Sequence, residues 1–522
     1  MTTQHSTEAE VEEGRLQRKL GFGGLTAIGF SNIVGSGWLF SAMYTAQAAG
    51  PAALLAWIAA GVLCVTIALV MVELGARQPE AGATVRWPLR SSGQLVASVV
   101  GVSVLLTVGA TAAEISAILK YAAHYLSWLQ NSHGSLTAAG VLTAMLLAVL
   151  LSALNWYGVR LFASLNNLIT IVKIIVPGLT VIALIAAGFH PSHLTDHGGF
   201  APYGYSAVLS SLAVGGVVYS VNGFQAAADF SGEARDPRRD VPRAVVAGIG
   251  LSVLMYLLLQ LAFLFAVPDT MLSQLGWHGV NFDSPFGQLS LILNLHWLSV
   301  LLYADAVVSP GGSAYVGVAI DTRHSYALAK NGVLPRFFLA VEEKSGIPRR
   351  ALVLNLLVIL VFLLPFSTWQ DVVSVVGDLY LLTYAAVAVA AAILIGPSSR
   401  RLAAWVPPLR VLASVAFLVA TEFVYWSGWH DLRIALSLTL LGLPLYVGQR
   451  WGKPDLGAGL RRGAWIIGYL LALLLLSWVG SFSGGENWLN APWDSLLVAV
   501  VAGVTWVAAL RSAEPAALAE RV

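Results

Sequence analysis

The sequence predicts an all-α integral membrane protein with about fourteen transmembrane helices, of which ten form two inverted five-helix repeats and four are additions. Three observations predict this fold class. Of the 522 residues, 57% are apolar and only 11% are charged, whereas about a quarter of the residues in a soluble protein are charged. The apolar residues occur in runs long enough to cross about 30 Å of hydrocarbon. Two of these runs contain glycine-rich interruptions at matching positions.

The composition excludes several classes of protein. The 29 Lys and Arg and 27 Asp and Glu residues are too few to solvate several water-soluble domains, which excludes a soluble enzyme. A net charge of +2 gives no indication of a nucleic-acid partner. Cys64 is the one cysteine, which excludes a disulfide framework and a thiolate metal cluster. We therefore expect no cofactor.

Apolar runs of roughly 20 residues define the expected spans. The first five lie at 21–47, 51–75, 94–124, 135–156 and 160–187. The second five lie at 206–230, 243–267, 285–320, 351–367 and 369–395. The last four lie at 408–428, 433–449, 463–482 and 493–510. The expected organisation is a core over 20–395, with repeats at 20–187 and 206–395, followed by four accessory helices within 396–510.

Loop charges orient these spans, because Lys and Arg accumulate on the cytoplasmic side. With the N-terminus inside, all Lys and Arg lie in cytoplasmic segments except Lys120, Lys173 and Arg433. The outer connections at 188–205 and 268–284 contain neither residue type. We therefore expect a multi-pass protein of the cell membrane. Its tails, at 1–19 and 511–522, are expected to be cytoplasmic, and the first 20 residues lack the features of a signal peptide.

Two spans are interrupted at mid-depth, the first by Gly35-Ser36-Gly37 and the sixth by Asn222-Gly223. Close helix packing through small residues is one explanation. The interruptions lie 187 residues apart, however, and the same offset carries the second span onto 238–262 and the third onto 281–311. Since five is an odd number of spans, the second copy enters from the opposite side. Inverted copies with matching broken helices are typical of secondary transporters.

A broken helix leaves backbone groups without partners at mid-depth. The half-helix that begins after Gly37 offers N–H groups and a positive dipole end, which suit a carboxylate. The half-helix that ends near Val221 offers carbonyl oxygens, which suit an ammonium group. Because an α-amino acid carries both groups on one carbon, the interruptions predict a zwitterionic substrate.

Four stretches resemble the amino acid–polyamine–organocation superfamily of permeases over roughly residues 20–395. They are IVGSGW at 33–38, YSVNGF at 219–224, SGEARDPRRDVPRAV at 231–245 and DTRHSYALAKNGVLPRFF at 321–338. The last two resemble cytoplasmic loops of this superfamily, and 321–350 is expected to be a long loop. The length, the fourteen spans, GSGWLF and DAVVSPGGSAY at 305–315 most resemble the aspartate–proton symporter-like permeases. The resemblance implies a leucine-transporter-type fold and alternating access.

The resemblance also implies a substrate site. The carboxylate would be held by Ile33, Val34, Gly35, Ser36 and Gly37. The amine would be held by the sixth span at Tyr219, Ser220 and Val221, next to Asn222 and Gly223. Phe224 or Tyr219 would form an aromatic lid. Gln225 stands where many relatives have an acidic residue, which removes one possible partner for a cationic substrate.

Lys173 lies inside the fifth span, where a charge costs roughly 2.5–3.5 kcal/mol. It either pairs with an interior carboxylate or couples transport to protons, since a desolvated lysine can load and release a proton as access alternates. Proton-coupled members of the superfamily that the chain resembles carry a lysine in this helix. That resemblance implies contacts of Lys173 with carbonyls of the first span and with Ser309 or Ser313.

Three further features carry polar groups. Glu114 either faces the transport core or pairs with a neighbour. Asp305 lies in the stretch at 305–315 that resembles the aspartate–proton symporter-like permeases. Together with Lys173, both residues are candidates for proton coupling. His190, His193 and His197 could bind metal if helical. The neighbouring Pro and Gly favour a plain loop there, so no metal site is predicted.

The expected function is secondary active import of an amino acid with protons. The alternative is an exchanger of amino acids or amines without net proton movement. An intramembrane enzyme would need a nucleophile–base or metal constellation at mid-depth, and the sequence offers none. The expected partners are the amino acid, protons and membrane lipid; neither the side chain of the substrate nor the oligomeric state is specified by these patterns.

Overall fold

A computed structural model describes residues 20–78, 83–131, 134–156, 160–225, 234–342, 346–364, 368–395 and 407–513. Within these ranges the chain is helical, with two isolated β-bridges and no strand. The expected tail at 1–19, most of the tail at 511–522, and the first part of the motif at 231–245 lie outside the described residues. The fold class is that predicted, an all-α membrane protein.

Helices coincide with each of the first five expected spans. They are α2 (Phe22–Ile33) and α3 (Gly37–Ala49), α4 (Ala53–Arg77), α6 (Gln94–Leu106) and α7 (Gly109–Ala122), α8 (Ala138–Trp156), and α9 (Arg160–Ala187). A further helix, α5 (Ala83–Ser92), lies in the connection before α6. The short 3-10 helices are η1 (Gly50–Ala52), η2 (Ser127–Leu129), η3 (Pro191–Leu194) and η5 (Arg336–Leu339).

The remaining nine expected spans also coincide with helices. The second five correspond to α10 (Ser206–Val214) and α11 (Val217–Ser220), α13 (Pro237–Ala266), α15 (Pro285–Ile292) and α16 (His296–Lys330), α17 (Arg349–Phe362), and α18 (Trp369–Leu394). The last four correspond to α19 (Leu409–Trp426), α20 (Trp429–Leu440) and α21 (Gly442–Arg450), α22 (Leu456–Val479), and α23 (Trp493–Arg511). The outer connection at 268–284 contains α14 (Asp269–Gly279).

Ten helical stretches in the described part of the chain are long and apolar enough to cross a membrane. The other expected spans are the two interrupted ones, the 14-residue α17 and the long, more polar α16. One expectation was wrong: residues 321–330, assigned to a loop, continue α16 to Lys330. Asp321, Thr322, Ser325, Leu328 and Ala329 are buried, a spacing that places them on one face of a helix, so the helix persists beyond the apolar run.

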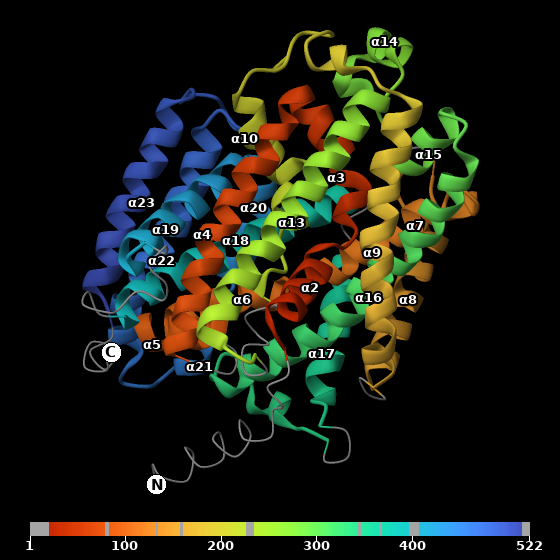
Figure 1. Cartoon of the computed structure of the whole chain (residues 1–522). Coiled ribbons are helices and arrows are strands. Elements are labelled where there is room, and N and C mark those ends of the chain that lie inside the picture. Colours follow the sequence, from red (N-terminus) through yellow and green to blue (C-terminus); the bar gives the residue numbers. More distant parts are fainter. Residues whose placement is uncertain are drawn as a thin grey trace.

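Helix α18 is the most enclosed of the candidate spans, with 94% of its apolar window buried. It packs against α19 on one side and against α5, α6 and α7 on the other. Figure 1 shows α19, α22 and α23 gathered at the left of the molecule, and α8 and α9 at the right. Large apolar side chains such as Val62, Leu146, Ile182 and Val504 are exposed on outward surfaces, as expected of helices that face lipid.

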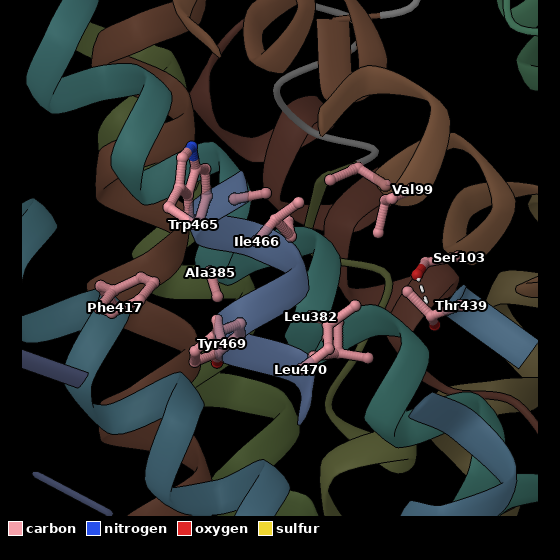
Figure 2. Close-up of a pocket in the computed structure, with 12 residues that line it drawn as sticks. Val99, Ser103, Leu382, Ala385, Phe417, Thr439, Trp465, Ile466, Tyr469 and Leu470 are labelled. Atoms are coloured by element: carbon pink, nitrogen blue, oxygen red, sulfur yellow. Dashed lines mark hydrogen bonds between the residues drawn. The ribbon is translucent and has the colours of Figure 1, made fainter. Parts of the chain in front are cut away.

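The helices α19 to α23, expected from the sequence to be accessory and called the accessory helices below, pack against α18 and other earlier helices. Figure 2 shows the crevice where α18 meets α6, α19, α20 and α22; its volume is only about 10 Å³. Its walls are apolar except for a few hydroxyl groups, and Ser103 and Thr439 share a hydrogen bond of 3.0 Å across it. This space is too small for a substrate, so the crevice is a packing joint that fixes α18 against the accessory helices.

Candidate functional site

The two interrupted spans cross at the centre of the molecule. Helix α2 ends at Ile33 and α3 begins at Gly37, while α11 ends at Ser220 and residues 221–224 are not helical. The Asn32 side-chain amide donates to the carbonyl of Gly223 at 2.8 Å. From α13, the Tyr256 hydroxyl lies 3.0 Å from the Ser220 carbonyl and 3.4 Å from that of Ile33. The buried tyrosine thus ties both interruptions together.

Glycine is required at this crossing for two reasons. A Cβ on Gly37 would lie 2.1 Å from Ser220 Oγ and 3.0 Å from its Cα. Gly223 has a φ of +105° and would place a Cβ 2.7 Å from the Asn32 carbonyl oxygen. Only glycine combines this positive φ with such close backbone contact, so the interruptions are places of direct approach between the two spans.

A cavity of about 100 Å³ opens at the crossing. Of the residues expected to bind substrate, its walls include Ile33, Gly35, Gly37, Tyr219, Ser220, Asn222 and Gly223. Of the residues expected near the coupling site, its walls include Glu114 and Ser313. The walls do not include Val34, Ser36, Val221, Phe224, Lys173, Asp305 and Ser309. Phe224 instead packs its ring against Tyr384, 5.4 Å away.

Glu114 places its carboxylate at the start of the α3 half-helix. The backbone N–H of Ser36 donates to both carboxylate oxygens, at 2.9 and 3.2 Å. The Tyr219 hydroxyl donates to the same carboxylate at 2.8 Å. Glu114 therefore lines the central cavity and is hydrogen-bonded there. The Glu114 carboxylate thus accepts a hydrogen bond from the Ser36 N–H, one of the groups that the sequence predicts to bind the substrate carboxylate.

Lys173 links three helices. Its ammonium, on a side chain only 2% exposed, donates to the Ser31 carbonyl of α2 at 3.1 Å and to Ser313 Oγ of α16 at 2.7 Å. These are contacts of the kind that the resemblance implied. Among the side chains that the structure describes, no carboxylate lies within ion-pair distance of Lys173, although the charges of Glu114 and Asp305 are close enough to interact with it. Ser309, the other candidate partner, donates to Asp305 at 2.7 Å.

An aromatic layer separates this cavity from a second space. Trp369, at the start of α18, donates its indole N–H to Ser36 Oγ at 2.9 Å and stacks on Phe40 and Tyr44. It also meets Tyr219 edge-on. Tyr44 lines a vestibule of about 610 Å³ beyond the layer, whereas Tyr219 lines the central cavity. Trp369 was not among the residues predicted from the sequence.

Other polar residues of the cavity were also missed. Asp321 and His324 of α16 and Tyr380 of α18 lie in its walls. Asp321 and His324 were placed in the expected loop that proved to be helix, and Tyr380 has no signal that distinguishes it from a packing residue. The side of the cavity away from the aromatic layer is therefore more polar than expected.

The chain can be compared with known proteins. A model of the family described as Amino acid permease matches residues 20–441. The glutamate/serine transporter AimA of Bacillus subtilis is 35% identical over 515 residues, 95% of this chain and 94% of its own length. The aspartate-proton symporter of the same organism is 31% identical over 498 residues, 94% of this chain and 95% of its own length.

A more distant relative is human cationic amino acid transporter 4, which is 27% identical over 65% of this chain and 54% of its own length. All these relatives are transporters, and the matches to the bacterial ones extend through the accessory helices. The chain is therefore a multi-pass membrane protein that transports amino acids rather than an enzyme, and it belongs to the amino acid permease family of the amino acid–polyamine–organocation superfamily.

Proposed function

We propose that the chain imports an amino acid together with protons, by alternating access across the cell membrane. The observation that carries this proposal is the buried ammonium of Lys173, held by a carbonyl of α2 and a hydroxyl of α16. Burying a lysine in this way, with no carboxylate within ion-pair distance among the described side chains, costs free energy, and buried charges of this kind in membrane proteins are typically functional. When it loses its proton, the amine keeps two N–H groups but loses its charge, so its hydrogen bond to α2 and the link between α2 and α9 weaken.

Glu114 supplies the second half of the coupling. A substrate carboxylate that binds the N–H groups at the start of α3 has to share the site with Glu114. Two carboxylates cannot both stay charged at such a site without large repulsion. Substrate binding therefore favours either a protonated Glu114 or its displacement from Ser36. In the first case, which we propose, the occupancy of the site depends on protons.

The proposed binding mode follows the two half-helices. The carboxylate lies at Gly35, Ser36 and Gly37, where the first-turn N–H groups of α3 lack intrahelical partners. The amine lies at the carbonyls that end α11, around Tyr219 and Ser220. Tyr219 contacts both Glu114 and Trp369, which suits it to respond when the site is filled.

We further propose that residues 20–187 and 206–395 are inverted repeats, with residues 396–510 as accessory helices and both tails in the cytoplasm. In this orientation the vestibule opens outward, and the aromatic layer around Trp369 is the closed outer gate. The polar side of the cavity at Asp321 and His324 then faces the cytoplasm. The structure would accordingly be closed to the outside.

For the substrate we propose an acidic amino acid. The names of the two bacterial relatives include glutamate and aspartate, and Gln225 offers no charge to a cationic side chain. Thermal unfolding of the purified chain with each of the twenty amino acids identifies the ligand, because a ligand that binds the folded state raises its stability by mass action.

Uptake by proteoliposomes tests the proposal. An imposed proton gradient, acidic outside, should accelerate uptake of the stabilising amino acid into empty vesicles. An exchanger would instead need internal substrate and ignore the gradient. Uptake that depends only on internal substrate would replace our proposal with exchange.

A further inference from the structure

Three side chains with metal-binding atoms meet at the end of the molecule where α14 lies, at the top in Figure 1. His193 and His197 come from the segment between α9 and α10, and Asp269 is the first residue of α14. They are far from the central cavity and take no part in the proposed coupling. The segment that the sequence suggested to be a plain loop is indeed irregular apart from η3, yet it brings the two imidazoles together.

The distances suit a shared ion. His197 Nε2 lies 2.9 Å and His193 Nε2 lies 3.7 Å from Asp269 Oδ1, and the three ligand atoms all lie within 4.8 Å of one another. Ligands of a tetrahedral Zn²⁺ with bonds of about 2.0–2.1 Å are separated by about 3.3 Å. The Asp269 side chain is 63% exposed, so it is free to make the small adjustment required.

The environment of His193 prepares it as a ligand. Its Nδ1 lies 3.0 Å from the Leu264 carbonyl oxygen, which keeps the proton on Nδ1 and directs the Nε2 lone pair toward Asp269. A metal-binding histidine typically has such a carbonyl partner behind it.

His197 is held in place by an unusual backbone. Its φ is +52°, and Gly198 and Gly199 follow with φ values of +100° and +86°. A residue other than glycine with a positive φ is uncommon and persists where its surroundings require it. The turn directs His197 onto Asp269, which is itself fixed next to Pro268 at the start of α14.

We propose that His193, His197 and Asp269 form a binding site for a divalent transition metal, Zn²⁺ in particular. Two imidazoles and one carboxylate are a donor set that suits Zn²⁺ and leaves a fourth position for water. The ion ties the segment before α10 to α14. Ser206 at the start of α10 and His278 of α14 line the vestibule, so the ion stiffens its rim.

The test uses the full chain, purified in detergent without a polyhistidine tag. Titration calorimetry with Zn²⁺ should show one site. Co²⁺ should give the visible absorption band of tetrahedral coordination with nitrogen and oxygen ligands. His193→Ala and His197→Ala should each lower the Zn²⁺ affinity about tenfold or more, since even loss of an outer partner of a ligand has that effect.

Two variants keep the result interpretable. Asp269→Asn preserves size but removes the charge, so it should weaken Zn²⁺ binding while the metal-free protein unfolds at an unchanged temperature. His190→Ala removes the neighbouring histidine, whose Nδ1 lies 3.1 Å from the Phe265 carbonyl oxygen and whose ring stacks on that of His193; it should lower the affinity far less than loss of either histidine ligand. Absence of Zn²⁺ binding, binding that survives both histidine variants, or equal loss in His190→Ala would overturn the proposal. None of these measurements depends on transport.

Discussion

Glu114 is a residue whose structural and functional roles coincide. It accepts a hydrogen bond from the Ser36 N–H at the start of a half-helix and another from the Tyr219 hydroxyl, so the Ser36 donor is already occupied in the protein without substrate. The negative charge also suits the positive end of α3. In the binding mode proposed above, the same contacts would make it a competitor of the substrate carboxylate, which is the basis of its proposed part in coupling.

Two substitutions separate these roles. Glu114→Gln keeps an acceptor oxygen for Ser36 and should change the free energy of unfolding by less than about 1 kcal/mol. Glu114→Ala leaves two buried donors, the Ser36 N–H and the Tyr219 hydroxyl, without an acceptor, and should lower the free energy of unfolding by about 2–4 kcal/mol. Thermal unfolding measures the difference.

The pH dependence of substrate affinity in Glu114→Gln tests the functional role of this residue. We expect Glu114→Gln to bind the substrate with an affinity that no longer depends on pH, because the amide cannot ionise. An affinity for the substrate that varies with pH as in the natural protein would remove Glu114 from the coupling mechanism.

At the scale of the element, the central feature is the crossing of α2–α3 with α10–α11. The two spans approach so closely at Gly37 and Ser220 that no side chain fits between them. Such contact transmits a shift of one half-helix directly to the other. Helix α13 adds a shared support through Tyr256.

Gly37→Ala should force α3 and α11 apart, because the new methyl group would overlap Ser220 Oγ and press on its backbone. We expect at least about a tenfold loss of substrate affinity, equivalent to about 1.4 kcal/mol, measured as substrate-induced thermal stabilisation. Partial recovery in Gly37→Ala with Ser220→Gly would identify the overlap as the cause.

Gly178→Ala is the matched control, since a Cβ at Gly178 in α9 has no heavy atom within 4 Å. It should bind substrate normally. If Gly37→Ala also binds normally, the crossing is not part of the substrate site.

The sequence predicted the helices because apolar runs in a membrane leave few alternatives, and it predicted both interruptions because glycine marks them. It predicted that Lys173 is exceptional because a charge inside an apolar run needs a reason. It did not predict that Glu114 caps Ser36, 78 residues away, because that contact depends on how the spans pack.

Trp369 was missed because an aromatic residue at a helix start is also typical of the membrane interface. Asp321 and His324 were missed because polar residues after an apolar run resemble a loop.

At the scale of the whole molecule, the vestibule and the central cavity lie on opposite sides of the aromatic layer. Trp369 contacts the walls of both spaces, so its position decides whether they join. Because α18 also packs along α19, the accessory helices brace the element that carries this tryptophan.

The proposed orientation can be tested by labelling, because the one cysteine, Cys64, is buried and can be replaced by serine. In that background Ser210→Cys, on the vestibule wall, should react with an impermeant maleimide added outside intact cells. Lys330→Cys, exposed at the end of α16, should react only in inside-out vesicles. The reverse pattern would invert the topology.

The central claim, that Lys173 couples transport to protons, is tested most directly by uptake into proteoliposomes that contain Lys173→Ala. We expect substrate binding to remain measurable while acceleration by a proton gradient disappears. Lys120→Ala removes the other buried lysine, which donates to Tyr44 at 2.8 Å, and should keep the gradient dependence whatever its effect on rate. Proton-driven uptake by Lys173→Ala at the natural protein's rate would contradict the account.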